Sequence, residues 1–128
     1  MVQQVTEGVS ITVETFYQAE QSNPINSEYL FAYRVTIENL TGSPLKLLSR
    51  KWEIIDSNGS YREVEGDGVV GEQPIIDAGD SYQYVSAANL RSDMGKMHGS
   101  YKMENLNNGK LLIVAIPEFQ MEAPFKMN

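Results

Sequence analysis

Residues 49–76 read SRKWEIIDSNGSYREVEGDGVVGEQPII, and this stretch decides the fold of the chain. Its first part, residues 51–56, is rich in side chains that favour a pleated strand, with Trp52 among them. The Asn-Gly pair at 58–59 can adopt the positive φ angles of a tight turn, because glycine has no Cβ and asparagine tolerates the left-handed region. Residues 60–65 then run back, with apolar residues spaced among charges. The stretch therefore predicts a β-hairpin.

The alternation of apolar and polar residues continues through the rest of the chain. It is clearest where five aromatic and branched residues share one face of a single strand. The predicted strands cover residues 9–13, 29–38, 45–56, 60–65, 81–85, 97–103 and 111–116, with a loop over 87–96. No segment carries a helical apolar stripe, so we predict an all-β fold, an antiparallel two-sheet sandwich of about seven strands.

Two features of the third strand refine this prediction. The apolar residues of 45–56 change face near Ser49 or Arg50, which indicates a β-bulge or a kink. Trp52 is expected in the core, because a large aromatic residue on the third strand packs between the two sheets. We expect a single domain over residues 1–128, with its core from about 9 to 119 and an irregular tail over 120–128.

Composition narrows the class of protein. The chain has 128 residues, no cysteine and a formal net charge of −7. Disulfides and thiolate chemistry are therefore excluded. The negative charge opposes binding to nucleic acid and to anionic membranes. The N-terminus lacks the basic and apolar regions of a signal peptide, and no apolar run is long enough to span a bilayer, so we expect a cytoplasmic protein.

A glycine motif follows the predicted hairpin. Gly66-x-Gly68-x-x-Gly71 matches the spacing of the dinucleotide-binding fingerprint, which works only where the glycines turn a strand into a helix. Here Glu72 and Gln73 lead into a proline with no helical stripe, and nearby carboxylates repel phosphate. We interpret the motif as a structural loop with unusual φ angles. Binding of an anion by its backbone amides stays open as an alternative, with Arg50 or Lys51 as counter-charge.

The residues of common catalytic and metal sites are scarce. His98 is the only histidine and is expected to point outward, so neither a Ser/His/Asp triad nor a His/Cys metal site can be assembled. Carboxylates remain as weak metal candidates, namely Glu63, Glu65 and Asp67. A solvated acidic face is the interpretation that we favour for them. We expect no enzymatic activity and no cofactor.

Several motifs, taken together, resemble the ApaG family over about residues 9–119. They are Leu48-Ser49-Arg50 with Trp52, Asn58-Gly59, Val64-x-Gly66-x-Gly68, Val69-Val70-Gly71-Glu72-Gln73-Pro74, Gly99-Ser100-Tyr101-x-Met103 and Ile116-Pro117. The resemblance implies an immunoglobulin or fibronectin type III-like sandwich. Two segments depart from the family pattern: Lys51 stands where the family has histidine, and residues 86–90 lack the expected Ser-Gly and Pro-Leu pairs. A metal or phosphate role that relied on that histidine does not carry over.

The resemblance also suggests a function. The family name is associated with cobalt resistance and magnesium efflux, and related domains in eukaryotic F-box and polymerase-interacting proteins look like protein-binding modules. We therefore expect a non-enzymatic binding module with an unknown protein partner. Its expected contact residues lie on and beside the glycine loop: Arg50, Gly66, Gly68, Gly71, Glu72 and Gln73. Pyrophosphate or nucleotide binding by residues 66–71, or divalent-cation binding by the acidic patch, are the alternatives.

The last predicted strand points to self-association. Residues 111–116 are apolar on both faces, whereas a strand of one sandwich usually has a polar face. By resemblance, Leu111 and Ile113 belong to the outward row. Such a row is expected to be covered by a partner subunit in a two-fold homodimer or by the apolar tail of the same chain. We expect the homodimer.

Overall fold

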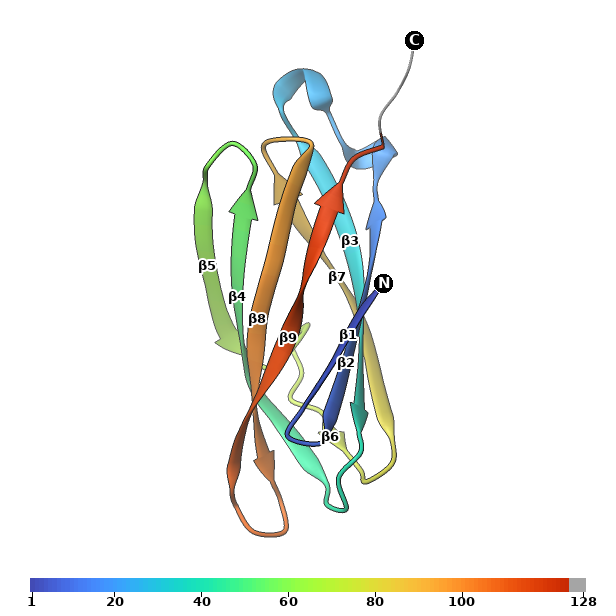
Figure 1. Cartoon of the computed structure of the whole chain (residues 1–128), viewed down its shortest axis with the longest axis vertical. Coiled ribbons are helices and arrows are strands. Elements are labelled where there is room, and N and C mark those ends of the chain that lie inside the picture. The colour runs from blue at the N-terminus through green and yellow to red at the C-terminus, as the bar shows by residue number, and fades with distance from the viewer. Residues whose placement is uncertain (125–128) are drawn as a thin grey trace.

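Two antiparallel sheets pack face to face in the computed structural model, which describes residues 1–124 (Figure 1). The strands are β1 (Val2–Thr6), β2 (Val9–Tyr17), β3 (Tyr29–Asn39), β4 (Leu45–Asp56), β5 (Tyr61–Asp67), β6 (Ile75–Ile76), β7 (Ser81–Leu90), β8 (Met94–Asn105) and β9 (Leu111–Glu122). Two single 3-10 turns, η1 (Ala19–Gln21) and η2 (Pro24–Asn26), connect β2 to β3. One sheet has the order β1-β2-β3-β7 and the other β5-β4-β8-β9, with β6 paired to β4. The predicted fold class is confirmed.

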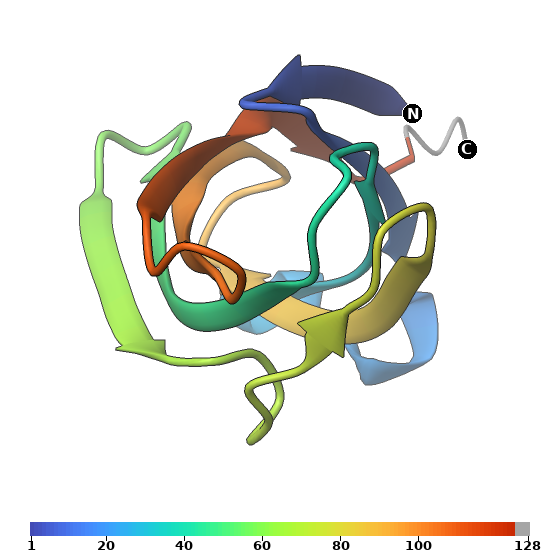
Figure 2. The same cartoon turned by 90° about the horizontal axis from the view of Figure 1, so that it is seen from below.

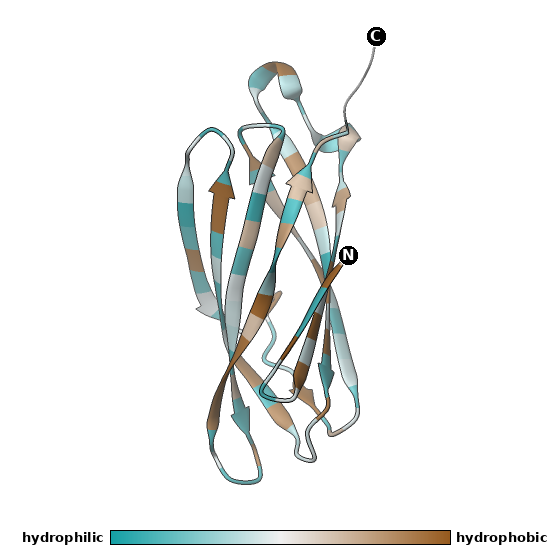
Figure 3. Ribbon diagram, in the orientation of Figure 1, coloured by the Kyte–Doolittle hydropathy of each residue, from teal (hydrophilic) through white to brown (hydrophobic). Residues whose placement is uncertain are grey.

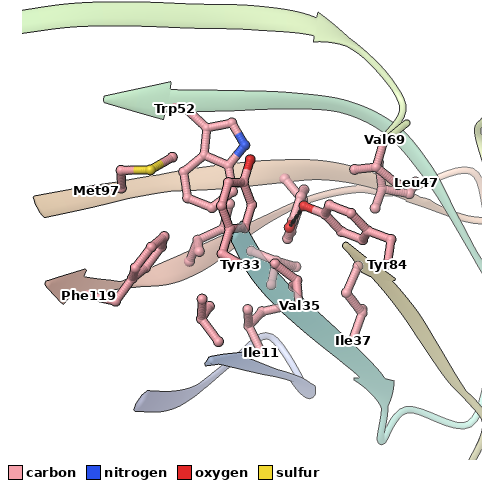
Figure 4. Close-up of a cluster of buried hydrophobic side chains, with 14 of the residues drawn as sticks. Ile11, Tyr33, Val35, Ile37, Leu47, Trp52, Val69, Tyr84, Met97 and Phe119 are labelled. Carbon is pink, nitrogen blue, oxygen red and sulfur yellow. Dashed lines mark hydrogen bonds between the residues drawn. The ribbon is translucent and has the colours of Figure 1, made fainter. Parts of the chain in front are cut away.

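The core lies between the sheets and follows from the alternation of the sequence. Hydrophobic and hydrophilic bands alternate along the long strands (Figure 3). Trp52 is only 3% exposed and packs edge-on against Tyr33 and Phe119, with ring centroids 5.4 and 5.8 Å away (Figure 4). Edge-to-face contacts of this kind add to the burial of the rings. The prediction that Trp52 belongs to the core is confirmed.

Two β-bulges explain where the apolar pattern is irregular. The β4–β8 register shifts between Leu47 and Ser49, so one extra residue moves the buried set to the other parity, as predicted. A second shift lies between Met97 and Gly99 in the β8–β9 pair. It sets one residue of β8 opposite two of β9 and places Pro117 in the bulge, where a missing N–H does not interrupt the ladder.

The second bulge corrects the predicted C-terminal boundary. The strand was expected to end at residue 116, and residues 120–128 were expected to be irregular. Instead β9 continues past the proline to Glu122, with Phe119 and Met121 buried. The rest of the predicted tail, residues 125–128, lies outside the described residues.

Two strands and one predicted loop also differ from the prediction. β1 and β6 were not predicted, because neither has a clear alternating pattern. The predicted loop over 87–96 is wrong, since β7 extends to Leu90 and β8 begins at Met94. Residues 87–90 pair in register with residues 29–32 of β3, so the neighbouring strand extends a segment of weak β propensity.

The two long edges of the sandwich differ. On one side β9 lies against both β1 and β2, so the two sheets meet there. On the other side β7 and β5 are the terminal strands of their sheets. Seen from below, β5 lies at the periphery, outside the ring that the other long strands form (Figure 2).

Within residues 1–124, neither 3-10 turn has the length or apolar character needed to cross a membrane.

Candidate binding site at the glycine loop

The glycine loop, residues 66–73, begins in the last two residues of β5 and closes in a tight turn. The amide of Val69 donates to the carbonyl of Glu72 at 2.8 Å, and the amide of Glu72 donates back at 2.9 Å. The two residues between them, Val70 and Gly71, have φ angles of 48° and 79°. Positive φ at both central positions is typical of a type I′ turn. Because Gly68 also has φ 59°, the predicted left-handed glycines are confirmed.

Arg50 holds this loop from β4. Its guanidinium donates to the carbonyl oxygens of Asp67 and Gly68 at 3.0 and 2.9 Å. Leu48 binds the loop from the same strand, since its carbonyl accepts the amide of Gly68 at 2.9 Å and the side-chain amide of Gln73 at 2.8 Å. These contacts fix the loop on the edge of the sheet, so its tip is presented by a rigid base.

The predicted contact residues therefore have different roles. Gly66 belongs to β5, where it pairs with Arg50. Gly68 and Gln73 lie at the base of the loop and anchor it to β4. Gly71 and Glu72 reach its exposed tip, where a Glu72 carboxylate oxygen accepts the hydroxyl of Tyr82 at 3.3 Å.

The geometry leaves few donors for an anion. The amides of Gly68, Val69 and Glu72 all donate to carbonyl oxygens of the chain, and so does the guanidinium of Arg50. The residues after the turn enter β6 and not a helix, so the helix N-terminus of the dinucleotide fingerprint is not formed here. Among the backbone amides of residues 68–72, those of Val70 and Gly71 are the ones that do not donate within the loop or to β4.

The acidic candidates lie on the outer face of the β5–β4 pair. Lys51 Nζ lies 3.1 Å from a carboxylate oxygen of Glu63 and 3.9 Å from one of Glu65. The hydrogen bond to Glu63 is the main cause of a raised pKa of the Lys51 ammonium. Residues 1–124 contain no group of three or more acidic, histidine or cysteine side chains that could hold a metal ion. The lysine thus occupies the position between the two carboxylates that a cation would need.

A second polar cluster lies beside this one on β4, β5 and β8. The Tyr61 hydroxyl donates to Glu53 at 2.6 Å, and this hydrogen bond is the main reason why the pKa of Tyr61 rises to about 12. His98 Nδ1 lies 3.2 Å from the other carboxylate oxygen of Glu53. His98 therefore lies on the outer face, as its parity predicts.

The structure also places the residues expected at a dimer interface. Leu111 and Ile113 are 55% and 58% exposed on the outer face of β9. Ile113 borders a shallow hollow of about 400 Å³ whose other lining residues are mostly charged or polar, including Lys51, Lys102 and Asp67. Within residues 1–124 the chain leaves these two side chains uncovered.

Sequence reasoning missed two exposed apolar residues of this region. Val70 is 60% exposed at the tip of the turn and Ile75 is exposed just beyond it. A signal was available for Val70, because a tight turn usually carries asparagine or glycine at that position. Sequence reasoning also missed a cleft between β5 and β7, whose lining includes Arg62 and Ser86. Those strands are distant in sequence and no local pattern joins them.

The fold and the loop define a class of protein: a small β-sandwich that carries a rigid, exposed loop on one sheet edge. The profile of the ApaG domain matches residues 19–105. The protein ApaG of Brucella canis is 45% identical over 124 residues, which is 97% of this chain and 95% of that protein. The chain therefore belongs to the ApaG family.

Solved structures agree with this assignment. A crystal structure of a candidate ApaA protein from Bordetella pertussis superposes with a TM-score of 0.87 at 36% identity, covering 92% of this chain and 95% of that one. The C-terminal domain of Wzt superposes with a TM-score of 0.55 at 9% identity, covering 98% of this chain and 79% of that one. The second likeness shows a shared fold alone.

Proposed function

We propose that this protein is a non-enzymatic protein-binding module whose contact surface is the loop tip, which we define as Val70, Gly71 and Glu72, together with the exposed residues Gln73 and Ile75 beside it. The observation that carries the proposal is Val70, a β-branched residue that is 60% exposed and held at φ 48°. A left-handed conformation costs an L-residue roughly 1–2 kcal/mol. Such strain persists where the surrounding structure enforces it, and it concentrates at functional positions.

The setting of the loop tip supports a binding role. Val70 and Ile75 offer exposed apolar side chains, and Glu72 and Gln73 add polar groups beside them. The loop is already fixed by Arg50, so little conformational entropy remains to be lost on binding. A rigid apolar tip rimmed by polar groups suits contact with another protein.

We propose further that the module acts in the cytoplasm. The association of the family with cobalt resistance and magnesium efflux then arises through the protein that the module binds. Direct cation binding is the weaker candidate, because Lys51 lies between Glu63 and Glu65.

Affinity capture from the native cell extract tests the proposal. Val70→Asp removes the apolar tip, and aspartate tolerates positive φ, so the variant should fold. Val5→Asp is the matched control, because Val5 is a 55% exposed valine on β1, away from the loop. We expect one protein to be captured by the wild type and by Val5→Asp and lost with Val70→Asp.

A thermal-shift screen with pyrophosphate, nucleotides, Mg²⁺ and Co²⁺ accompanies the capture. The proposal predicts no shift for the wild-type protein with any of them. A shift of several degrees with one ligand class, combined with capture that is indifferent to Val70→Asp, would overturn it.

A further inference from the structure

Within residues 1–124, the sandwich lacks a strand opposite β5. The sheet order places β9 over β1 and β2, which leaves β5 and β7 as terminal strands on the other side. By parity with Trp52 and Ile54, the side chains of Val64 and Arg62 lie on the inner face of β5. Val64 is nevertheless exposed, because no strand of the other sheet within residues 1–124 covers this face. The uncovered position lies beside the edge of β7, since Arg62 of β5 reaches the carbonyl of Asn89.

The free edge of β7 presents backbone groups to this position. Asn89 pairs with Leu30 of β3, yet its carbonyl accepts the Arg62 guanidinium at 2.7 Å and so points away from β3. Backbone groups of an antiparallel strand alternate in direction with a period of two. The N–H and C=O groups of Ala87 and Val85 therefore point the same way, toward the open position.

A cleft occupies the space between these two edges. It has a volume of about 340 Å³, and its lining includes Tyr33, Trp52, Val64 and Met97 together with Arg50 and Arg62. A second hollow of about 430 Å³ continues from it, shares Arg62 and Asn89, and adds Arg91. The two hollows together form one groove along the edge of β7, and most of its exposed lining is polar.

The charge of this groove is opposite to that of the chain. Three of the four arginines of the sequence line it, namely Arg50, Arg62 and Arg91. Glu28 is the one carboxylate among the lining residues. Elsewhere acidic residues prevail, since the formal net charge is −7. Arg62 is exposed, and its guanidinium donates to the backbone carbonyl of Asn89. A ligand that carries a hydrogen-bond acceptor can therefore reach this guanidinium.

We propose that an extended acidic segment of another protein binds in this groove by adding a strand to the free edge of β7. Its backbone bonds to the outward groups of Val85, Ala87 and Asn89. Its inward side chains cover Val64 and place carboxylates against Arg62. Strand addition of this kind derives affinity from backbone bonds and specificity from alternate side chains. The inference goes beyond the proposed function, because it assigns a second contact surface, separate from the loop tip, and names the chemistry of the segment that this surface binds.

A displayed library of random octapeptides tests the inference. We expect the wild-type protein to select sequences in which acidic residues alternate with β-branched ones. Trp52, the only tryptophan, lines the groove, so bound peptide should change its emission. Arg62→Glu should weaken binding of the selected peptides by about tenfold or more, since it reverses the charge that faces them. Lys110→Glu makes the same charge change in the exposed β8–β9 turn and should leave binding unchanged.

One further variant and one changed peptide test the added strand and the charge attraction separately. Ala87→Pro removes one outward N–H and leaves the β3–β7 ladder bonds, so it should weaken binding by about fivefold, the worth of about one hydrogen bond. Arg62→Glu should also bind a peptide in which the acidic residues are replaced by lysine, a rescue that a purely structural role would not produce. If Ala87→Pro unfolds, N-methylation of alternate backbone amides of the selected peptide tests the added strand in its place, since it removes peptide N–H donors and should weaken binding to the wild-type protein.

Several results would overturn the inference. The selection could give neutral or basic peptides, or no peptide at all. A thymidine octanucleotide could displace the selected peptides. The wild-type protein could also be a dimer that Ala87→Pro dissociates. Val70→Asp should bind the selected peptides normally. If no peptide is selected but a protein is still captured through Val70, the groove is not a binding site and the proposed function stands. If peptides are selected but no protein is captured through Val70, the groove is a binding site and the proposed function of the loop tip is wrong.

Discussion

Replacing each left-handed glycine of the loop by alanine should give unequal losses of stability. Gly71 has φ 79° and open space around the position of a Cβ, whereas Gly68 has φ 59° and a Cβ there would collide with the backbone carbonyl of Glu72. Both variants carry the cost of a left-handed L-residue. In Gly68→Ala alone, the added methyl group also forces two backbone segments apart. This displaces the turn that Val69 and Glu72 close.

The magnitudes follow from these contacts. A left-handed alanine costs roughly 1–2 kcal/mol, which is the whole expected loss for Gly71→Ala. Moving the turn away from Gly68 also breaks or lengthens two or three hydrogen bonds, each worth about 1 kcal/mol net. Those at risk are the two bonds between Val69 and Glu72 and the bond from Arg50 to the carbonyl of Gly68. Gly68→Ala should therefore lower the free energy of unfolding by about 3–5 kcal/mol.

Urea unfolding followed by the emission of Trp52 measures both losses. Gly71→Ala is the matched control, because the two variants add the same methyl group at the same kind of φ angle. A difference between them below about 0.5 kcal/mol would refute the reasoning, since it would mean that the loop does not approach Gly68 closely. If both variants keep wild-type stability and lose binding of pyrophosphate, the anion-binding interpretation of the loop is correct.

Three other predictions concern the core, alkaline pH and self-association. Trp52→Ala should lower stability by about 3–5 kcal/mol, and the wild-type emission should be blue-shifted; emission like that of free tryptophan would contradict a core position. Burial raises the pKa of the Tyr84 and Tyr101 hydroxyls above the ordinary 10.0. These two tyrosines therefore ionise in the unfolded chain before they ionise in the folded one. The free energy of unfolding should be at its full value below about pH 10 and fall as the pH rises beyond it. Equal denaturation midpoints at about pH 8 and pH 11 would count against this. Ile113→Lys should convert a homodimer into a folded monomer in sedimentation, and a wild-type monomer above micromolar concentration would show the interface prediction to be wrong.

Local patterns account for the parts of the fold that were predicted. Residues 29–38 alternate strictly, and β3 buries the predicted face with Phe31, Val35 and Ile37 inside. The change of face before Trp52 predicted a bulge and the register confirms one. In each case the information lies within a few neighbouring residues, since side-chain direction in a strand alternates with a period of two.

Neighbouring strands decided the parts that were not predicted. Ala87 and Ala88 have weak β propensity, yet they extend β7 because β3 offers a partner in register. Pro117 would ordinarily end a strand, but the bulge opposite His98 accommodates it and β9 continues to Glu122. A segment of weak β propensity forms a strand when a neighbouring strand offers it a partner, and the residues of the segment do not specify that neighbour.

The sequence by itself therefore determined the fold class, the family, the buried tryptophan and the left-handed glycines, because each depends on local backbone preference or on residues close along the chain. Only the tertiary structure decided what the candidate residues do. It turned Arg50 inward to hold the loop, placed Lys51 between Glu63 and Glu65, and set Val70 at the exposed tip. It also brought Arg62 of β5 to the edge of β7, because the packing of one sheet on the other brings together strands that do not pair.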